Sequence, residues 1–161
     1  SIPFMDQISL KNDELKKEMS DFFDKILAGN GPKVLIECDL EGALIKNFIE
    51  SLDLNRLGIL YDTGNANALN LDPIKDFVLL SKYIHEIHIK DRSSITGNTN
   101  RLGMGDTPFN LYKDIINKND WKGPLVMETP TFTNFFEEAA QNTNFLKNWL
   151  KEAWYKWELY L

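Results

Sequence analysis

The sequence predicts an α/β fold built from parallel (βα) units. Short apolar runs of strand length alternate along the chain with longer segments whose apolar residues recur at helical spacing. Three of the runs end in an acid, at Glu37, Asp62 and Glu128, and a fourth has His88 near its end. These positions advance by 25 (37 to 62), 26 (62 to 88) and 40 (88 to 128). A strand–helix unit repeating at about this interval indicates a parallel sheet with right-handed crossovers.

The first half of the chain is expected to contain two full strands and two helices. After a strand end and loop in residues 1–10, Asn12 is a typical N-cap for a helix to about residue 28. The Gly-Asn-Gly-Pro run that follows ends this helix. The first full strand is then expected at 33–38, and apolar residues at helical spacing predict a short helix at 43–52.

The second strand, residues 57–62, ends abruptly in an acid and is followed by a polar, glycine-containing turn. This pattern is typical of a buried parallel strand that brings a carboxylate to the rim of a sheet. Asp72-Pro73 predicts the start of the next helix, because Asp caps well and proline fits the first helical position. Ser81-Lys82 ends that helix, and the third strand is expected at 83–89.

A long polar loop, residues 90–106, follows the third strand. Its first residues, 90–92, could be a solvated strand exit, although Arg92 is well placed to hold a substrate oxygen. Gly103-x-Gly105 is a weak signal for phosphate binding and fits a flexible loop equally well. The remaining expected elements are a helix capped by Thr107-Pro108 that ends near 118, a strand at 124–128, and an aromatic helix from Asn134 through Trp149, Trp154 and Trp157.

Composition limits the class of protein. With 161 residues, of which 43% are hydrophobic, the chain suits one domain over residues 1–161. A net charge of −6 argues against a nucleic-acid or anionic-membrane partner, because phosphate binding needs basic patches. Cys38 is the only cysteine, which favours a reducing compartment and hence the cytoplasm. No apolar run approaches the length of a membrane span.

The four strand-end residues suggest a metal centre, because the C-terminal ends of parallel strands meet at one edge of the sheet. Three carboxylates and one imidazole form an oxygen-rich donor set that suits Mn²⁺, Mg²⁺ or Co²⁺, with Zn²⁺ as a further candidate. A sugar could bind such an ion through two adjacent oxygens, and the ion would stabilise an enediolate. Glu37 and Glu128 could then flank the reacting carbon, one removing the proton and the other returning it.

Each of these residues also has an ordinary explanation. A single acid at a strand end is usually a solvated rim residue, and Asn65 could simply bond to the backbone of its own turn. His85 and His88 point to opposite faces of a regular strand, so only one of them can face the site. Spacing alone does not say which. Nor does periodicity decide between a closed barrel and a flavodoxin-like open sheet.

Several motifs resemble the sugar phosphate isomerase/epimerase group of xylose isomerase-like barrels. They are Tyr61-Asp62-Thr63-Gly64-Asn65, Ile87-His88-Ile89-Lys90-Asp91-Arg92, Leu102-Gly103-Met104-Gly105-Asp106 and Gly123-Pro124-Leu125-Val126-Met127-Glu128. The resemblance implies a (βα)8 barrel and a metal-dependent isomerase or epimerase acting on a small sugar or sugar phosphate. It further implies the metal ligands Glu37, Asp62, His88 and Glu128, with Glu37 and Glu128 as the acid/base pair. It implies Arg92 as a substrate contact, and it favours His88 over His85.

Two departures from this family pattern are visible. Many relatives have histidine at the place of Asn65, which we therefore treat as a candidate substrate-binding residue. A whole barrel needs about 250 residues, whereas this chain resembles the second half, strands 5–8, with residues 1–4 similar to the exit from strand four. We therefore expect a barrel domain that lacks its N-terminal half. Its open strand edges would favour association, including a homo-oligomer.

Two other functions are compatible with the sequence. A degenerate or truncated barrel could bind a partner or a sugar without catalysis. Abasic-site DNA endonucleases share the superfamily, but they use a multi-metal cluster with several histidines. This chain has two histidines, Asn65 in place of a third, and a negative net charge. Metal content would separate a catalytic barrel from a degenerate one.

Overall fold

Five parallel strands form one open sheet, in the spatial order β1-β2-β3-β4-β7. The computed structural model describes residues 1–5, 8–52 and 55–151. The strands are β1 (Ile2–Phe4), β2 (Val34–Cys38), β3 (Leu57–Asp62), β4 (Ile84–Ile89) and β7 (Leu125–Met127). The predicted α/β class with parallel pairing is confirmed. The N-terminal strand end also joins the sheet, because Ile2 pairs with Ile36 of β2.

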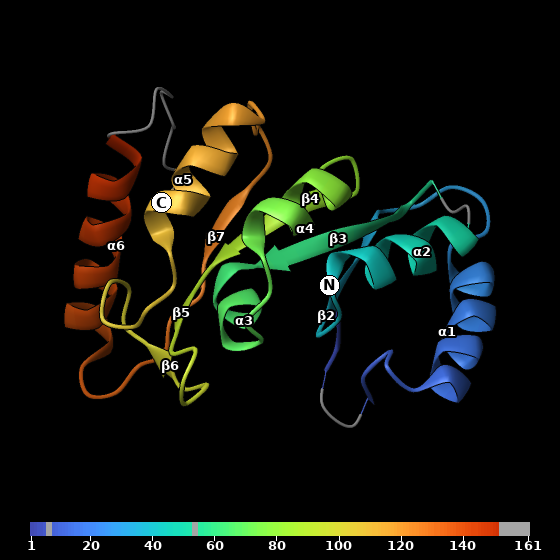
Figure 1. The fold of residues 1–161 in the computed structure, drawn as a ribbon, viewed down its shortest axis with the longest axis horizontal. Coiled ribbons are helices and arrows are strands. Elements are labelled where there is room, and N and C mark those ends of the chain that lie inside the picture. Colours follow the sequence, from blue (N-terminus) through green and yellow to red (C-terminus); the bar gives the residue numbers. More distant parts are fainter. Residues whose placement is uncertain (6–7, 53–54, 152–161) are drawn as a thin grey trace.

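The helices follow one another along the sheet in chain order (Figure 1). They are α1 (Asp13–Ile26), α2 (Gly42–Leu52), α3 (Thr63–Ala68), α4 (Pro73–Leu80), α5 (Phe109–Lys118) and α6 (Phe135–Lys151). All helices predicted from apolar spacing are present, although Trp154 and Trp157 lie outside the described residues. Among the helices of the described residues, none is long and apolar enough to cross a membrane.

Local capping explains where α1 and α4 begin. The Asn12 side chain accepts two backbone N–H groups of the first turn of α1, at 2.9 and 3.2 Å. Asp72 does the same for α4, at 3.0 and 3.2 Å, with Pro73 at the first helical position. The expected cap on α5 is wrong in detail. The helix starts after Pro108 without a side-chain cap, and the Thr107 hydroxyl instead accepts the backbone N–H of Arg92 at 3.1 Å.

Alternation along the strands separates a core side of the sheet from a site side. Tyr61 packs edge-on against Phe77 of α4, with ring centroids 5.8 Å apart, so Tyr61 faces the helices. Asp62, the next residue, therefore faces away from them. In β4 the two isoleucines that flank His88 are fully buried in the same core. Core packing thus fixes which residues can line the opposite side.

Two features of the described chain, a short helix and a two-stranded ribbon, were not predicted. The turn after Asp62 is a short helix, α3, and the Asp62 carboxylate caps it by accepting the backbone N–H of Asn65 at 2.7 Å. Within the polar loop, β5 (Asp91–Arg92) and β6 (Thr99–Asn100) form a small antiparallel ribbon. Both elements are too short to show a periodic apolar pattern.

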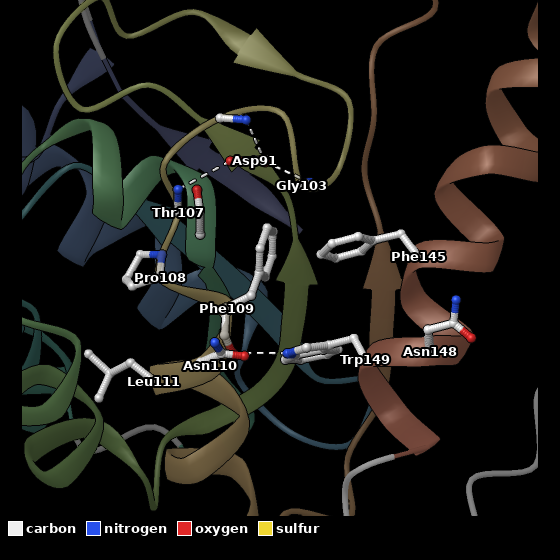
Figure 2. Close-up of a pocket in the computed structure, with 11 residues that line it drawn as sticks. Asp91, Gly103, Thr107, Pro108, Phe109, Asn110, Leu111, Phe145, Asn148 and Trp149 are labelled. Carbon is white, nitrogen blue, oxygen red and sulfur yellow. Dashed lines mark hydrogen bonds between the residues drawn. The ribbon is translucent and has the colours of Figure 1, made fainter.

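Asp91 anchors this loop and is fully buried, so the interpretation of residues 90–92 as a solvated strand exit is wrong for Asp91. Its carboxylate accepts the backbone N–H groups of Gly103, Gly105 and Thr107, at 2.8, 2.9 and 3.2 Å (Figure 2). The N–H groups of the Gly103-x-Gly105 pattern therefore bind Asp91 within the chain. A side chain at Gly105 would not fit, because its Cβ would lie 2.3 Å from the Asp91 carboxylate.

A cavity of about 720 Å³ lies beside this loop, between α5 and α6 (Figure 2). Phe109 packs edge-on against Phe145 and Trp149 at ring distances of 5.1 and 6.0 Å, and the Trp149 indole N–H donates to the Phe109 carbonyl at 2.9 Å. None of the six candidate site residues lines this cavity. Its walls combine residues of the anchored loop, among them Asp91 and Gly105, with residues of α5 and α6.

Replacing Asp91 by Asn tests the anchoring of the loop. The amide keeps the shape of the side chain, but its NH₂ group would face backbone N–H donors. Because hydrogen bonds to a charged acceptor are worth about 1.5–3 kcal/mol each, Asp91→Asn should lower the free energy of unfolding by about 2–4 kcal/mol. Urea unfolding of the complete protein measures this. Asp114→Asn, on the exposed side of α5, is the control and should change stability by about 0.5 kcal/mol or less. Equal stability of the two variants would refute the anchoring role.

Candidate metal centre

Three of the four predicted ligands meet at the C-terminal end of the sheet. Asp62 pairs in register with His88. Glu128 lies one residue past β7, and its backbone N–H donates to the Ile89 carbonyl at 3.1 Å. One ligand-type atom from each of Asp62, His88 and Glu128 lies within 4.8 Å of the other two. Neighbouring strand ends thus bring together residues that are far apart in the sequence.

Glu37, the fourth predicted ligand, lies outside this close group of atoms in the described structure. Ile36 pairs with Ile59, so Glu37 lies level with Leu60 rather than with Asp62. Its carboxylate accepts a hydrogen bond from the Asn65 side-chain amide at 2.6 Å. Glu37 is therefore linked to the group of Asp62, His88 and Glu128 by way of Asn65.

Asn65 is buried, with 4% of its surface exposed, and its side chain does not serve its own turn. While the amide nitrogen donates to Glu37, the amide oxygen accepts from the Arg92 guanidinium at 2.7 Å. The other side of that guanidinium donates to the Gly97 carbonyl, with Nε at 2.8 Å. Because the Asn65 backbone N–H also binds Asp62, all six predicted site residues belong to one set of contacts.

Lys90, which sequence reasoning did not assign, lies among the ligand-type side chains. Its ammonium nitrogen is 2.5 Å from a Glu128 oxygen and 3.5 Å from the Asp62 Oδ2 atom. Only 13% of the Lys90 side chain is exposed. A signal for it exists in the sequence, because Lys90 is two residues beyond His88 and shares its side of the chain.

Glu86 is a second residue that sequence reasoning missed. Its carboxylate lies 3.0 Å from the His88 Nε2 atom, while the His88 Nδ1 atom lies 2.9 Å from a Glu128 oxygen. A neutral ring that donates from Nε2 to Glu86 would present its Nδ1 lone pair to the ligand group. Carboxylates that orient a metal-binding histidine in this way are common. Spacing by two residues on one strand is again the signal.

His85 lies away from this group. The pairing of β3 with β4 shifts register between Ile59 and Leu60, so β4 is not the regular strand assumed from the sequence. The imidazole of His85 lies over Gly58, where a Cβ atom would be 2.3 Å from the His85 ring. Its Nε2 atom is 2.7 Å from the Lys33 ammonium nitrogen. Of the two histidines, His88 is the one beside Asp62 and Glu128.

The electrostatics of the group suit a bound cation. Burial raises the pKa of Asp62 to about 6; Lys90 and the Asn65 N–H counteract this, and the negative charges of Glu37 and Glu128 add to it. Burial also acts to raise the pKa of Glu128, but hydrogen bonds from Lys90 and His88 outweigh it and hold that pKa below its usual value. Among the described residues, the Asp62 Oδ2 atom has no hydrogen-bond partner, and the Lys90 ammonium is its ion-pair partner.

Within the described residues, a buried carboxylate oxygen without a hydrogen bond and a donor set of two carboxylates with one imidazole fit a divalent metal ion. Asp62, His88 and Glu128 would hold it. Carboxylate oxygens suit Mn²⁺, Mg²⁺ or Co²⁺, and the imidazole suits Zn²⁺ as well.

Comparison with known proteins identifies the family of the fold. The sequence matches the model of the xylose isomerase-like TIM barrel family over residues 20–153. A search of curated protein sequences gives no significant match. Among solved structures, a xylose isomerase domain protein from Planctomyces limnophilus has a TM-score of 0.70 at 23% identity, covering 92% of this chain and 55% of its own.

Two further structures have similar folds. D-allulose 3-epimerase from Methylomonas sp., in complex with D-allulose, has a TM-score of 0.71 at 14% identity, covering 85% of this chain and 56% of its own. The IOLI protein with a bound zinc atom has a TM-score of 0.75 at 13% identity, covering 96% and 64%. This chain thus spans between 55% and 64% of the length of these proteins. Since the family model covers most of the sequence and these neighbours share the fold, the chain belongs to the xylose isomerase-like TIM barrel family.

Proposed function

We propose that this chain is part of a metal-dependent isomerase or epimerase that acts on a small sugar or sugar phosphate through an enediolate. The observation that supports this most is the close grouping of Asp62, His88 and Glu128, with the carboxylate of Glu37 next to it. Sugar epimerases among the similar folds point to the same substrate class. The activity is proposed for the complete protein, in which further barrel strands would close the pocket. The single cysteine supports a cytoplasmic location.

Asp62, His88 and Glu128 would hold the ion, and Glu37 would be a fourth ligand. Glu37 would also lie within reach of the substrate bound to that ion. When bound, the ion supplies Lewis-acid stabilisation of negative charge on substrate oxygens. Glu37 and Glu128 come from strands on either side of β3 and β4, so they could address opposite faces of one carbon. One carboxylate would remove the proton beside the carbonyl, and the other would return it.

Asn65 and Arg92 would contact the substrate. The Arg92 guanidinium lies 2.7 Å from the Asn65 amide oxygen, and the Asn65 amide nitrogen lies 2.6 Å from Glu37. A sugar oxygen that binds Arg92 would therefore be positioned relative to the Glu37 carboxylate. The group that would bind the substrate, Arg92, and the group that would transfer the proton, Glu37, would thus lie close together.

Solvent exchange tests the proton-transfer step. The complete protein, loaded with Mn²⁺ in D₂O, is incubated with D-allulose, D-fructose, D-tagatose and their phosphates, and deuterium at the carbon next to the carbonyl is followed by NMR. Positioned acid–base groups contribute on the order of 10²–10⁴-fold in rate. Glu37→Gln and Glu128→Gln should each slow exchange by that order, with metal occupancy measured on the same samples.

Glu137→Gln, on the exposed side of α6, is the matched control and should exchange at the wild-type rate. The mechanism is wrong if the metal-loaded wild type exchanges no proton with any of these sugars, or if Glu128→Gln exchanges as fast as wild type. The protein as purified should contain about one divalent ion per site. A metal-free protein that still binds a sugar would indicate the degenerate, non-catalytic barrel.

Glu86 gives a separate prediction about metal binding. Removing a carboxylate that orients a metal-binding histidine typically costs about 10–100-fold in affinity. Glu86→Leu should therefore weaken Mn²⁺ binding by that order in calorimetric titration, while Glu86→Gln, which keeps an acceptor for the His88 ring, should lose less. Wild-type affinity in Glu86→Leu would rule out this role. Because the chain has two histidines, ¹⁵N spectra of labelled histidine can also follow the His88 tautomer directly.

A further inference from the structure

The ammonium group of Lys90 occupies the space between two of the three clustered ligand residues. It lies 2.5 Å from a Glu128 oxygen and 3.5 Å from the Asp62 Oδ2 atom. That Asp62 oxygen is buried and has no hydrogen bond in the described structure. Lys90 is therefore the cation that compensates Asp62 in this arrangement.

The fold holds Lys90 in place through contacts that do not involve these carboxylates. The hydroxyl of Thr63, a fully buried residue, accepts the Lys90 backbone N–H and donates to the Lys90 carbonyl, both at 3.0 Å. Gly64 leaves room for the lysine stem, because a Cβ atom there would lie 2.9 Å from the Lys90 Cγ and carbonyl oxygen. Both residues directly follow Asp62, so the turn that places the carboxylate also places the lysine.

Lys90 and a divalent ion would compete for the same carboxylates. An ammonium group at these distances uses lone pairs of Asp62 and Glu128 that a metal ion would need. Two positive charges a few ångströms apart also repel each other strongly in a partly buried site. The ion can therefore bind fully only if the Lys90 ammonium moves away from Asp62.

We infer that Lys90 is a built-in competitor of the metal ion, which keeps Asp62 and Glu128 together in the metal-free protein and lowers the affinity of the site for divalent cations. This rests on the proposed function only in taking the cluster to be a metal site. Lys90 would thereby act as a positioning residue. When no metal is bound, its ammonium group pairs with carboxylates that would otherwise be buried without a counter-charge.

The test is calorimetric titration of MnCl₂ into the complete protein, stripped with EDTA and desalted. Lys90→Met keeps the apolar stem and removes the charge, and Lys90→Gln is a second variant that keeps a hydrogen-bond donor to Glu128. Both should bind Mn²⁺ roughly tenfold or more tightly than wild type. Lys17→Met, on the exposed side of α1, changes the net charge equally, and its Mn²⁺ affinity should stay within about twofold of wild type.

In EDTA, Lys90→Met should melt at a lower temperature than Lys17→Met, and added Mn²⁺ should raise its melting temperature more than that of wild type.

The outcomes separate this inference from the proposed function. A purely structural lysine would not tighten metal binding when removed, so equal or weaker Mn²⁺ binding by both Lys90 variants, beside a wild type that binds, overturns the inference alone. If Lys90→Met binds Mn²⁺ and wild type does not, the inference about Lys90 is supported, and the proposal that the wild-type protein is a metal-dependent enzyme is wrong. If neither wild type nor the Lys90 variants bind Mn²⁺, both are wrong.

Discussion

The buried carboxylate of Asp62 is the constraint on which the rest of the site depends. It ends β3, caps α3 through the Asn65 N–H, and keeps one oxygen without a hydrogen bond from any residue that the structure describes. An ionised carboxylate buried without compensation costs several kcal/mol, so a cation has to lie next to it. Lys90 provides that charge in this structure, and a divalent ion would provide more. The Lys90 ammonium and the Asn65 N–H thus compensate the buried negative charge of Asp62.

The position of Asp62 is in turn set by the core. Tyr61 packs among the aromatic residues of α4 and α5, and this packing forces Asp62 to the opposite side. The same alternation holds for His88 between two buried isoleucines. Because the side-chain period of a strand is two, a slip of one residue would exchange the core residues for the ligands. The large burial energy of the core therefore resists any register that would dismantle the site.

The alternation of strands and helices could be predicted because strand ends and apolar periodicity are local features of the sequence. The same features pointed to Glu37, Asp62 and Glu128 as candidates, whereas the choice of His88 and Arg92 came from the family resemblance. Lys90 and Glu86 share the side of His88 and were detectable in principle, but charged residues near strand ends are more often solvated. Asp91 was not predictable in this way. Its burial depends on a loop that folds back from residues 103–107, and nothing near Asp91 in the sequence signals this. Of the two histidines, His88 lies beside Asp62 and Glu128, as the resemblance implied. The strict alternation assumed for β4 does not hold, because the pairing of β3 with β4 shifts register.

Asn65, at a place where the family resemblance implies histidine, has a defined chemical consequence. Arg92 can only donate hydrogen bonds and an ionised Glu37 can only accept them, so the Asn65 amide can bridge them in one orientation alone, with its oxygen toward Arg92 and its nitrogen toward Glu37. An amide does not titrate, whereas an imidazole at this position could place a second positive charge beside Glu37. Asn65 therefore links the guanidinium to the carboxylate without altering the charge between them. Among the described residues, the positive charges in contact with this set are then confined to Lys90 and Arg92, to which a bound metal ion would add. The net charge of the site therefore changes when a metal ion binds, and it does not depend on the protonation of residue 65.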